Sequence, residues 1–231
     1  MSISNESRSR VKAIFEPIAL GMGRLGLTPD GLTLIGFGIT VAGAILLATE
    51  QWLIGGIVVF IGGVFDMFDG TLARATGKVS PLGAFMDSVF DRWGEAIVYV
   101  GIVVGAVSAG FDEATMLAAA AMGMAFMVSY TRAKSEGLGF TPGTGMAAVG
   151  VMPREIRLVI LCLGLIITGS LGAPILQPAA GETCIESCIQ EGGFVLLGTL
   201  AIIAIGATIT VIQRIVHVRS QAKSAATPST K

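Results

Sequence analysis

Six long apolar segments constrain the fold of this chain more than any other feature of its sequence. They cover about residues 31–49, 53–75, 81–108, 114–134, 155–173 and 192–215. Each is near the ~20 residues that a helix needs to cross the hydrocarbon core of a bilayer. The composition, with 53% hydrophobic and 13% charged residues, is that of a membrane protein rather than a soluble domain. The sequence therefore predicts an all-α integral membrane protein with six transmembrane helices.

The two ends of the chain are more polar than its centre. Residues 1–26 predict an N-terminal cytoplasmic segment and an amphipathic juxtamembrane helix, because apolar side chains recur there at helical spacing. This helix either lies on the membrane surface or merely leads into the first span. Residues 27–219 hold the six-helix domain. Residues 220–231 are rich in Ser, Ala, Thr and Lys, and we predict that they are disordered.

Basic residues indicate the orientation of the helices in the membrane. Residues 25–73, 93–131 and 158–213 contain no Lys or Arg, and the connections on one side of the membrane all lie in these ranges. Every basic residue lies at the opposite helix ends. The positive-inside rule then predicts a multi-pass protein of the plasma membrane with both termini in the cytoplasm.

Four aspartates lie where apolar segments meet polar ends: Asp66, Asp69, Asp87 and Asp91. A carboxylate at the centre of a membrane helix costs ~2.5–3.5 kcal/mol on insertion scales, so this group has to be neutralised. Residues three and four apart share one helix face, which places the first two aspartates on one stripe and the last two on another. An all-oxygen cluster of this kind suits Mg²⁺ or Mn²⁺, and we predict a divalent metal site at the cytoplasmic face.

The sequence between the two stripes predicts a tight helical hairpin. Gly77 ends the first helix, Ser80 caps the second and Pro81 takes its first position. The small residues beside the carboxylates leave room for a flat or charged ligand. A cation transporter or channel also explains buried aspartates, but it does not explain this spacing of small residues or an arginine beside the cation path. These positions are Gly70, Ala73, Arg74 and Gly83.

The spacing Asp-x2-Asp-Gly-x2-Ala-Arg-x8-Gly-x3-Asp-x3-Asp resembles the signature of the CDP-alcohol phosphotransferase family, and all eight fixed positions match. The resemblance implies an enzyme that displaces CMP from a CDP-linked lipid, such as CDP-diacylglycerol, with the hydroxyl of a second alcohol. It implies two divalent ions, Mg²⁺ or Mn²⁺, a homodimer, and Asp91 as general base with possible metal contact. The implied metal ligands are Asp66, Asp69, Asp87 and Asp91, and the implied CDP-lipid site comprises Asp66, Asp69, Gly70, Ala73, Arg74 and Gly83.

A second polar cluster lies at the cytoplasmic ends of the fourth and fifth spans. Its members are either ordinary topology determinants and headgroup anchors or an anion pocket for an acceptor that already carries phosphate. In the second interpretation the acceptor-binding residues are Ser129, Arg132, Lys134, Arg154 and Arg157.

The segment from Ser129 to Glu136 resembles the branch of the family that uses inositol phosphate, the phosphatidylinositol-phosphate and archaetidylinositol-phosphate synthases. The segment from Pro153 to Arg157 keeps the two arginines of that branch but not the residues between them. Inositol phosphate is therefore the expected acceptor, with glycerol 3-phosphate, free inositol and serine as alternatives. We expect membrane lipids, and no nucleic acid, as further partners.

The three cysteines have no neighbouring residues of a metal site in the sequence. Cys184 and Cys188 lie four residues apart in the longest outer loop, where they either pair in an oxidising compartment or remain free. Zinc chemistry and a Cys–His nucleophile are not indicated, because the single histidine, His217, lies near the C-terminus.

Overall fold

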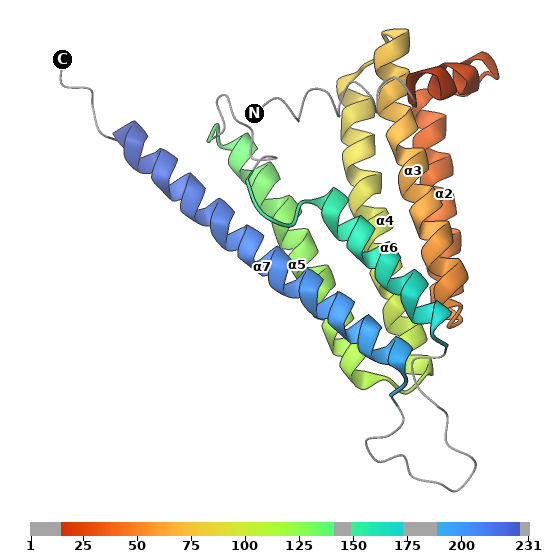
Figure 1. The fold of residues 1–231 in the computed structure, drawn as a ribbon. Helices are drawn as coiled ribbons and strands as arrows, with labels where there is room; N and C mark the ends of the chain where they lie inside the picture. Colours follow the sequence, from red (N-terminus) through yellow and green to blue (C-terminus); the bar gives the residue numbers. More distant parts are fainter. Residues whose placement is uncertain (1–14, 141–148, 173–188, 227–231) are drawn as a thin grey trace, which may run out of the picture.

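The computed structural model describes residues 15–140, 149–172 and 189–226, and every regular element in these ranges is a helix. A first helix covers residues 15–24. Six more follow: α2 (Pro29–Ala48), α3 (Trp52–Thr76), α4 (Pro81–Ser108), α5 (Asp112–Gly137), α6 (Arg154–Ser170) and α7 (Glu191–Ala226) (Figure 1). The all-α prediction is confirmed, and each predicted span overlaps one of these six helices.

Four helices, α2, α3, α5 and α7, are long and apolar enough to cross a membrane by length and composition. The other two differ for visible reasons. α4 carries four charged residues, Asp87, Asp91, Arg92 and Glu95, and α6 has only 17 residues. A membrane protein is thus confirmed, whereas the count of six spans stays a prediction.

The α3–α4 hairpin forms as its sequence predicts. Gly77 ends α3 in the left-handed region at φ 67°, where a side chain would be strained. The hydroxyl of Ser80 accepts a hydrogen bond of 2.9 Å from the backbone N–H of Gly83, and Pro81 opens α4. The turn returns the chain at once, so that α3 and α4 run antiparallel (Figure 1).

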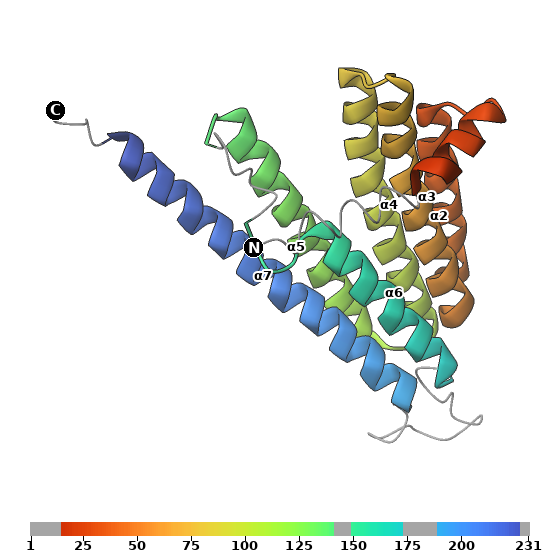
Figure 2. The same ribbon diagram turned by 45° about the horizontal axis from the view of Figure 1, so that its top comes forward.

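Both arms of this hairpin pack closely against α2. Glycines permit the approach: a Cβ atom added at Gly43 would lie 2.9 Å from the backbone N of Val59 on α3, and one at Gly101 on α4 would lie 2.4 Å from the carbonyl O of Ala44. Further along, α6 packs on α3 and α7, and α5 packs on α4 and α7. In Figures 1 and 2, α5 and α7 diverge from the α2–α4 group toward the end that carries the hairpin turn.

The C-terminal end differs from the prediction. α7 continues to Ala226, so residues 220–226, which were predicted to be disordered, are helical. The sequence Gln-Ala-Lys-Ser-Ala-Ala is rich in strong helix formers, and this outweighs its polar composition. Residues 1–14 and 227–231, together with Cys184 and Cys188, lie outside the described residues. Cys162 is buried as a free thiol.

Gly101→Ala should destabilise the protein, because the new methyl group meets the backbone of α2 and forces the helices apart, which costs roughly 1–3 kcal/mol. We expect the thermal unfolding midpoint in detergent to fall by several degrees. Gly123→Ala on α5 is the matched control, since a Cβ there meets nothing within 4 Å. Equal midpoints for the two variants would contradict the close α2–α4 packing.

Candidate active site

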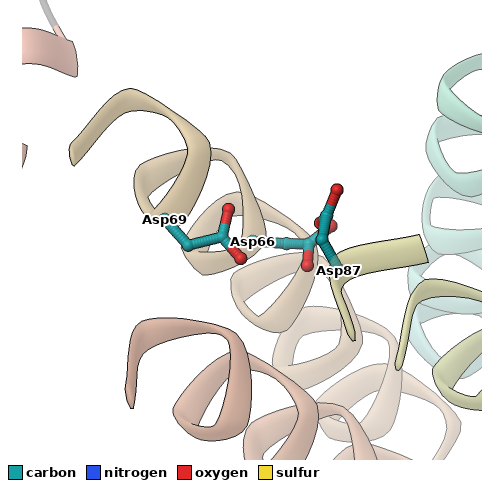
Figure 3. Close-up of side chains that lie close together, drawn as sticks. All are labelled: Asp66, Asp69 and Asp87. Carbon is teal, nitrogen blue, oxygen red and sulfur yellow. The ribbon is translucent and has the colours of Figure 1, made fainter. Parts of the chain in front are cut away.

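Three of the four predicted carboxylates converge in the space between α3 and α4. Asp66, Asp69 and Asp87 each offer a carboxylate oxygen, and these oxygens all lie within 4.8 Å of one another (Figure 3). The first two stand nearly one turn apart on α3, and the third comes from the second turn of α4. Three hard oxygen donors at this separation fit a divalent cation such as Mg²⁺ or Mn²⁺.

Asp69 is the most enclosed carboxylate of the three, with 4% of its surface exposed. The hydroxyl of Thr33 on α2 donates a hydrogen bond to its Oδ2. This contact fixes the direction of the carboxylate, as outer partners of metal ligands do. Sequence reasoning missed Thr33, because it lies 36 residues away on a helix whose pattern carries no sign of chemistry.

Asp91 lies beside this cluster and is held by two arginines. Its Oδ1 lies 2.6 Å from Nη1 of Arg154, and its Oδ2 lies 3.0 Å from Nη1 of Arg92. The same Arg154 nitrogen is 3.1 Å from Oδ2 of Asp66. Arg154 therefore joins the predicted base to a predicted metal ligand. Asp91 was predicted as a fourth metal ligand, but among the described residues the close group of carboxylates comprises only the other three. The side chain of Asp91 is 12% exposed.

Five of the six residues predicted to hold the CDP-lipid line one pocket on the α2 side of the cluster, and the sixth, Asp66, does not line it. A Cβ atom added at Gly70 would lie 3.2 Å from Nη1 of Arg74, so the missing side chain leaves room for that guanidinium. Asp30 from α2 and Lys78 from the hairpin turn also line the pocket, and the prediction did not include them. The predicted members that line it are Asp69, Gly70, Ala73, Arg74 and Gly83.

A wider cleft opens on the other side of the aspartates, between α4, α5, α6 and α7. Asp87 and Asp91 form part of its wall, so Asp87 lines both this cleft and the pocket on the α2 side. The cleft also contains four of the five residues predicted to bind the acceptor: Ser129, Arg132, Arg154 and Arg157. The fifth, Lys134, is exposed and does not line it.

The arginines of the cleft differ in what they bind. Arg132 donates from Nε to Oε1 of Glu136 at 3.0 Å, and both side chains are about two-fifths exposed. Arg157 is almost completely buried and binds Glu95. Arg214 on α7, which sequence reasoning also missed, is 3% exposed and donates to the backbone carbonyls of Val128 and Val149. These carbonyls carry no net charge, so Arg214 adds positive charge to the cleft.

Asp66→Asn, Asp69→Asn and Asp87→Asn should each weaken binding of Mn²⁺ to the purified protein by about tenfold or more, because loss of even an outer-shell partner costs 10–100-fold. Equilibrium binding followed by Mn²⁺ paramagnetic resonance measures this without any substrate. Asp112→Asn, at the exposed start of α5, is the control and should bind like the unmodified protein. Unchanged affinity in all three variants would remove the metal site.

Comparison with known proteins agrees with this geometry. Residues 26–179 match the model of a family described as CDP-alcohol phosphatidyltransferase. An archaetidylinositol phosphate synthase from Pyrococcus horikoshii is 36% identical over 154 residues, which make up 67% of this chain and 77% of that protein.

Two crystal structures of Mycobacterium tuberculosis phosphatidylinositol phosphate synthase share the fold. The structure with CDP-DAG bound has a TM-score of 0.73 and 27% identity, and the match covers 89% of this chain and 94% of the other. The structure in complex with manganese and citrate has a TM-score of 0.73 and 26% identity, with 89% of each chain covered.

These findings decide between the enzyme and the cation transporter. The family model covers more than half of the chain, and the apolar helices are those of a multi-pass membrane protein. The aspartate cluster has the oxygen donors that a divalent metal binds. The chain belongs to the CDP-alcohol phosphatidyltransferase family and is a CDP-alcohol phosphotransferase.

Proposed function

We propose that the chain transfers the phosphatidyl group, or a related lipid phosphate, from a CDP-linked lipid such as CDP-diacylglycerol to a hydroxyl of inositol phosphate, with release of CMP. One observation carries the proposal: Arg132 and Arg154 line the same cleft as Asp87 and Asp91. An acceptor whose phosphate binds these arginines would hold its free hydroxyl near Asp91. The names of the archaeal and mycobacterial relatives support this acceptor.

The donor would occupy the pocket on the α2 side. Arg74, whose guanidinium keeps its charge at any physiological pH, is the proposed partner of a CDP phosphate. Gly70, Ala73 and Gly83 leave space for the nucleotide. The proposed metal site is held by Asp66, Asp69 and Asp87, with Asp91 adjacent, and takes two Mg²⁺ or Mn²⁺ ions that would neutralise charge on the diphosphate and the leaving CMP.

Asp91 is the proposed general base. Its carboxylate lies between the metal-site aspartates and the arginine-lined cleft, and it would take the proton from the acceptor hydroxyl. The oxygen of that hydroxyl then forms the new bond to the β-phosphorus of the CDP-lipid, and the bond to the CMP oxygen breaks. Arg92 and Arg154 are both in contact with Asp91 and hold its carboxylate in place.

The phosphate of the acceptor is assigned to Ser129, Arg132 and Arg154. Arg132 can exchange its present partner cheaply, because an exposed ion pair such as that with Glu136 contributes only ~0–1 kcal/mol. A phosphate offers charge-assisted hydrogen bonds of roughly 1.5–3 kcal/mol each. Arg214 adds charge behind these residues. Glycerol 3-phosphate would satisfy the same arginines and is the second candidate, ahead of free inositol and serine.

The proposal also includes the membrane arrangement. All six helices α2–α7 would span the plasma membrane, with the site facing the cytoplasm, where CDP-linked substrates occur. The Lys and Arg distribution supports this orientation. The chain is further proposed to work as a homodimer, by resemblance to its family, and crosslinking in native membranes tests that assembly.

Arg132→Ala should raise the KM for inositol phosphate by about tenfold or more and leave the KM for CDP-diacylglycerol nearly unchanged, since one charge-assisted hydrogen bond to the phosphate is lost. CMP release by purified protein is the measurement, with glycerol 3-phosphate, free inositol and serine as competing acceptors. Lys134→Ala is the matched control. This substitution also removes a positive charge from α5, two residues after Arg132, but Lys134 does not line the cleft.

Two outcomes would contradict the acceptor assignment. If Arg132→Ala and Lys134→Ala gave the same acceptor KM, the cleft arginines would serve as topology anchors only. If free inositol or serine supported faster CMP release than every phosphorylated alcohol, the acceptor would not carry phosphate, although the family chemistry would stand.

The orientation is tested by cysteine labelling in a background without the three native cysteines. Gln51→Cys, between α2 and α3, should react with an impermeant maleimide in intact cells. Leu138→Cys, at the opposite end of α5, should react only after permeabilisation. Both positions are exposed, so access to the thiol is limited by the membrane alone. The reverse pattern would invert the proposed topology.

A further inference from the structure

We infer that Glu95 and Arg157 form a positioning pair that holds the base Asp91 and the anion-binding Arg154 in register, and that Arg157 is not itself a ligand of the acceptor. This inference rests on the proposed function in one respect, the role of Arg154 toward the acceptor phosphate. The sequence predicted that Arg157 binds the acceptor, whereas the structure indicates that it positions neighbouring residues.

The contact between the two side chains uses the whole guanidinium. Nε of Arg157 donates to Oε1 of Glu95 at 2.9 Å, and Nη2 donates to Oε2 at 2.9 Å. The remaining nitrogen, Nη1, donates to the backbone carbonyl of Met152 at 3.1 Å. The arginine side chain is 1% exposed and the glutamate side chain 13%. Each nitrogen of Arg157 is therefore already bound to protein, which leaves it poorly placed to bind a phosphate from the cleft.

The pair connects two elements that otherwise have other packing partners. α4 packs mainly on α2 and α5, whereas α6 packs on α3 and α7. Glu95 follows Asp91 by one helical turn on α4, and Arg157 follows Arg154 by three residues in the first turn of α6. A bidentate, buried ion pair fixes both distance and direction, so it sets the start of α6 against the helix that carries the base.

Arg154 shows the consequence of this register. A single nitrogen of its guanidinium lies 2.6 Å from Asp91 and 3.1 Å from Asp66, and such a placement tolerates little shift of the helix start. The bond from Arg157 to the Met152 carbonyl also fixes the turn that leads into Pro153 and α6. Glu95 and Arg157 thus act on the reaction through Asp91 and Arg154.

The test is a double-mutant cycle with Glu95→Gln and Arg157→Gln, read as CMP release with whichever acceptor supports it in the unmodified enzyme. Each single variant should lower kcat by about tenfold to a hundredfold, because misplacement of about 1 Å can cost a hundredfold. The acceptor KM should rise to the same extent in both single variants, because each of them releases Arg154, the proposed partner of the acceptor phosphate. The double variant should be no slower than the slower single variant, since both substitutions break one unit.

A role of Arg157 as phosphate ligand gives a different pattern. Arg157→Gln would then raise the acceptor KM tenfold or more with little change in kcat, whereas Glu95→Gln would leave the acceptor KM unchanged, and the effects of the two substitutions would multiply in the double variant. Either result overturns the inference. The acceptor is first identified by CMP release with the unmodified enzyme. If that assay shows that inositol phosphate is not the acceptor, the double-mutant cycle can still be interpreted with the acceptor that was found.

Arg157→Lys tests the same point if the glutamine variants do not fold. A lysine keeps the charge but not the bidentate geometry, so a positioning role predicts a lower kcat. A phosphate ligand would tolerate the lysine in kcat and lose affinity for the acceptor. Glu113→Gln, an exposed carboxylate at the start of α5, is the control and should match the unmodified enzyme in both constants.

Discussion

The crowding of negative charge at one end of the α3–α4 hairpin is the constraint on which the rest of the structure depends. Carboxylates in apolar surroundings are stable only when cations or hydrogen-bond donors face them. The protein supplies these donors from three different helices: Thr33 on α2 for Asp69, Arg92 on α4 for Asp91, and Arg154 on α6 for Asp66 and Asp91. The elements around the hairpin are therefore arranged as much by charge as by apolar packing.

The helix α2 gives this arrangement its rigidity. Since α3 and α4 both pack on α2 through glycines, the aspartate-bearing faces are held apart at a set distance and the volume between them stays open to ligands. The two flanking cavities then share Asp87. A donor on one side and an acceptor on the other would meet at this wall, which agrees with a transfer between two bound molecules.

The sequence was sufficient where the determinants are local. Hydropathy located the helices, Gly77 and Ser80 located the hairpin turn, and the spacing of the aspartates located the cluster of three carboxylates. It was insufficient where the partner lies on another helix. No sequence pattern around Thr33 indicates that it contacts Asp69. The sequence around Arg157 likewise does not indicate whether this side chain binds a ligand in the cleft or pairs with Glu95. Lys134 and Arg132 differ only by helix face, a distinction that becomes decisive once α5 is placed against α4 and α7.

The long sequence separation within the ion pairs has a consequence for biogenesis. Arg154 follows its partner Asp66 by 88 residues, and Arg157 follows Glu95 by 62. A nascent chain therefore presents the complete acidic hairpin to the translocon well before the cations from α6 emerge from the ribosome. During that interval Asp66 lacks the arginine that it contacts in the folded protein, and Asp91 has Arg92 but not Arg154 beside it. The start of α6 thus completes the charge compensation of a hairpin that already packs on α2.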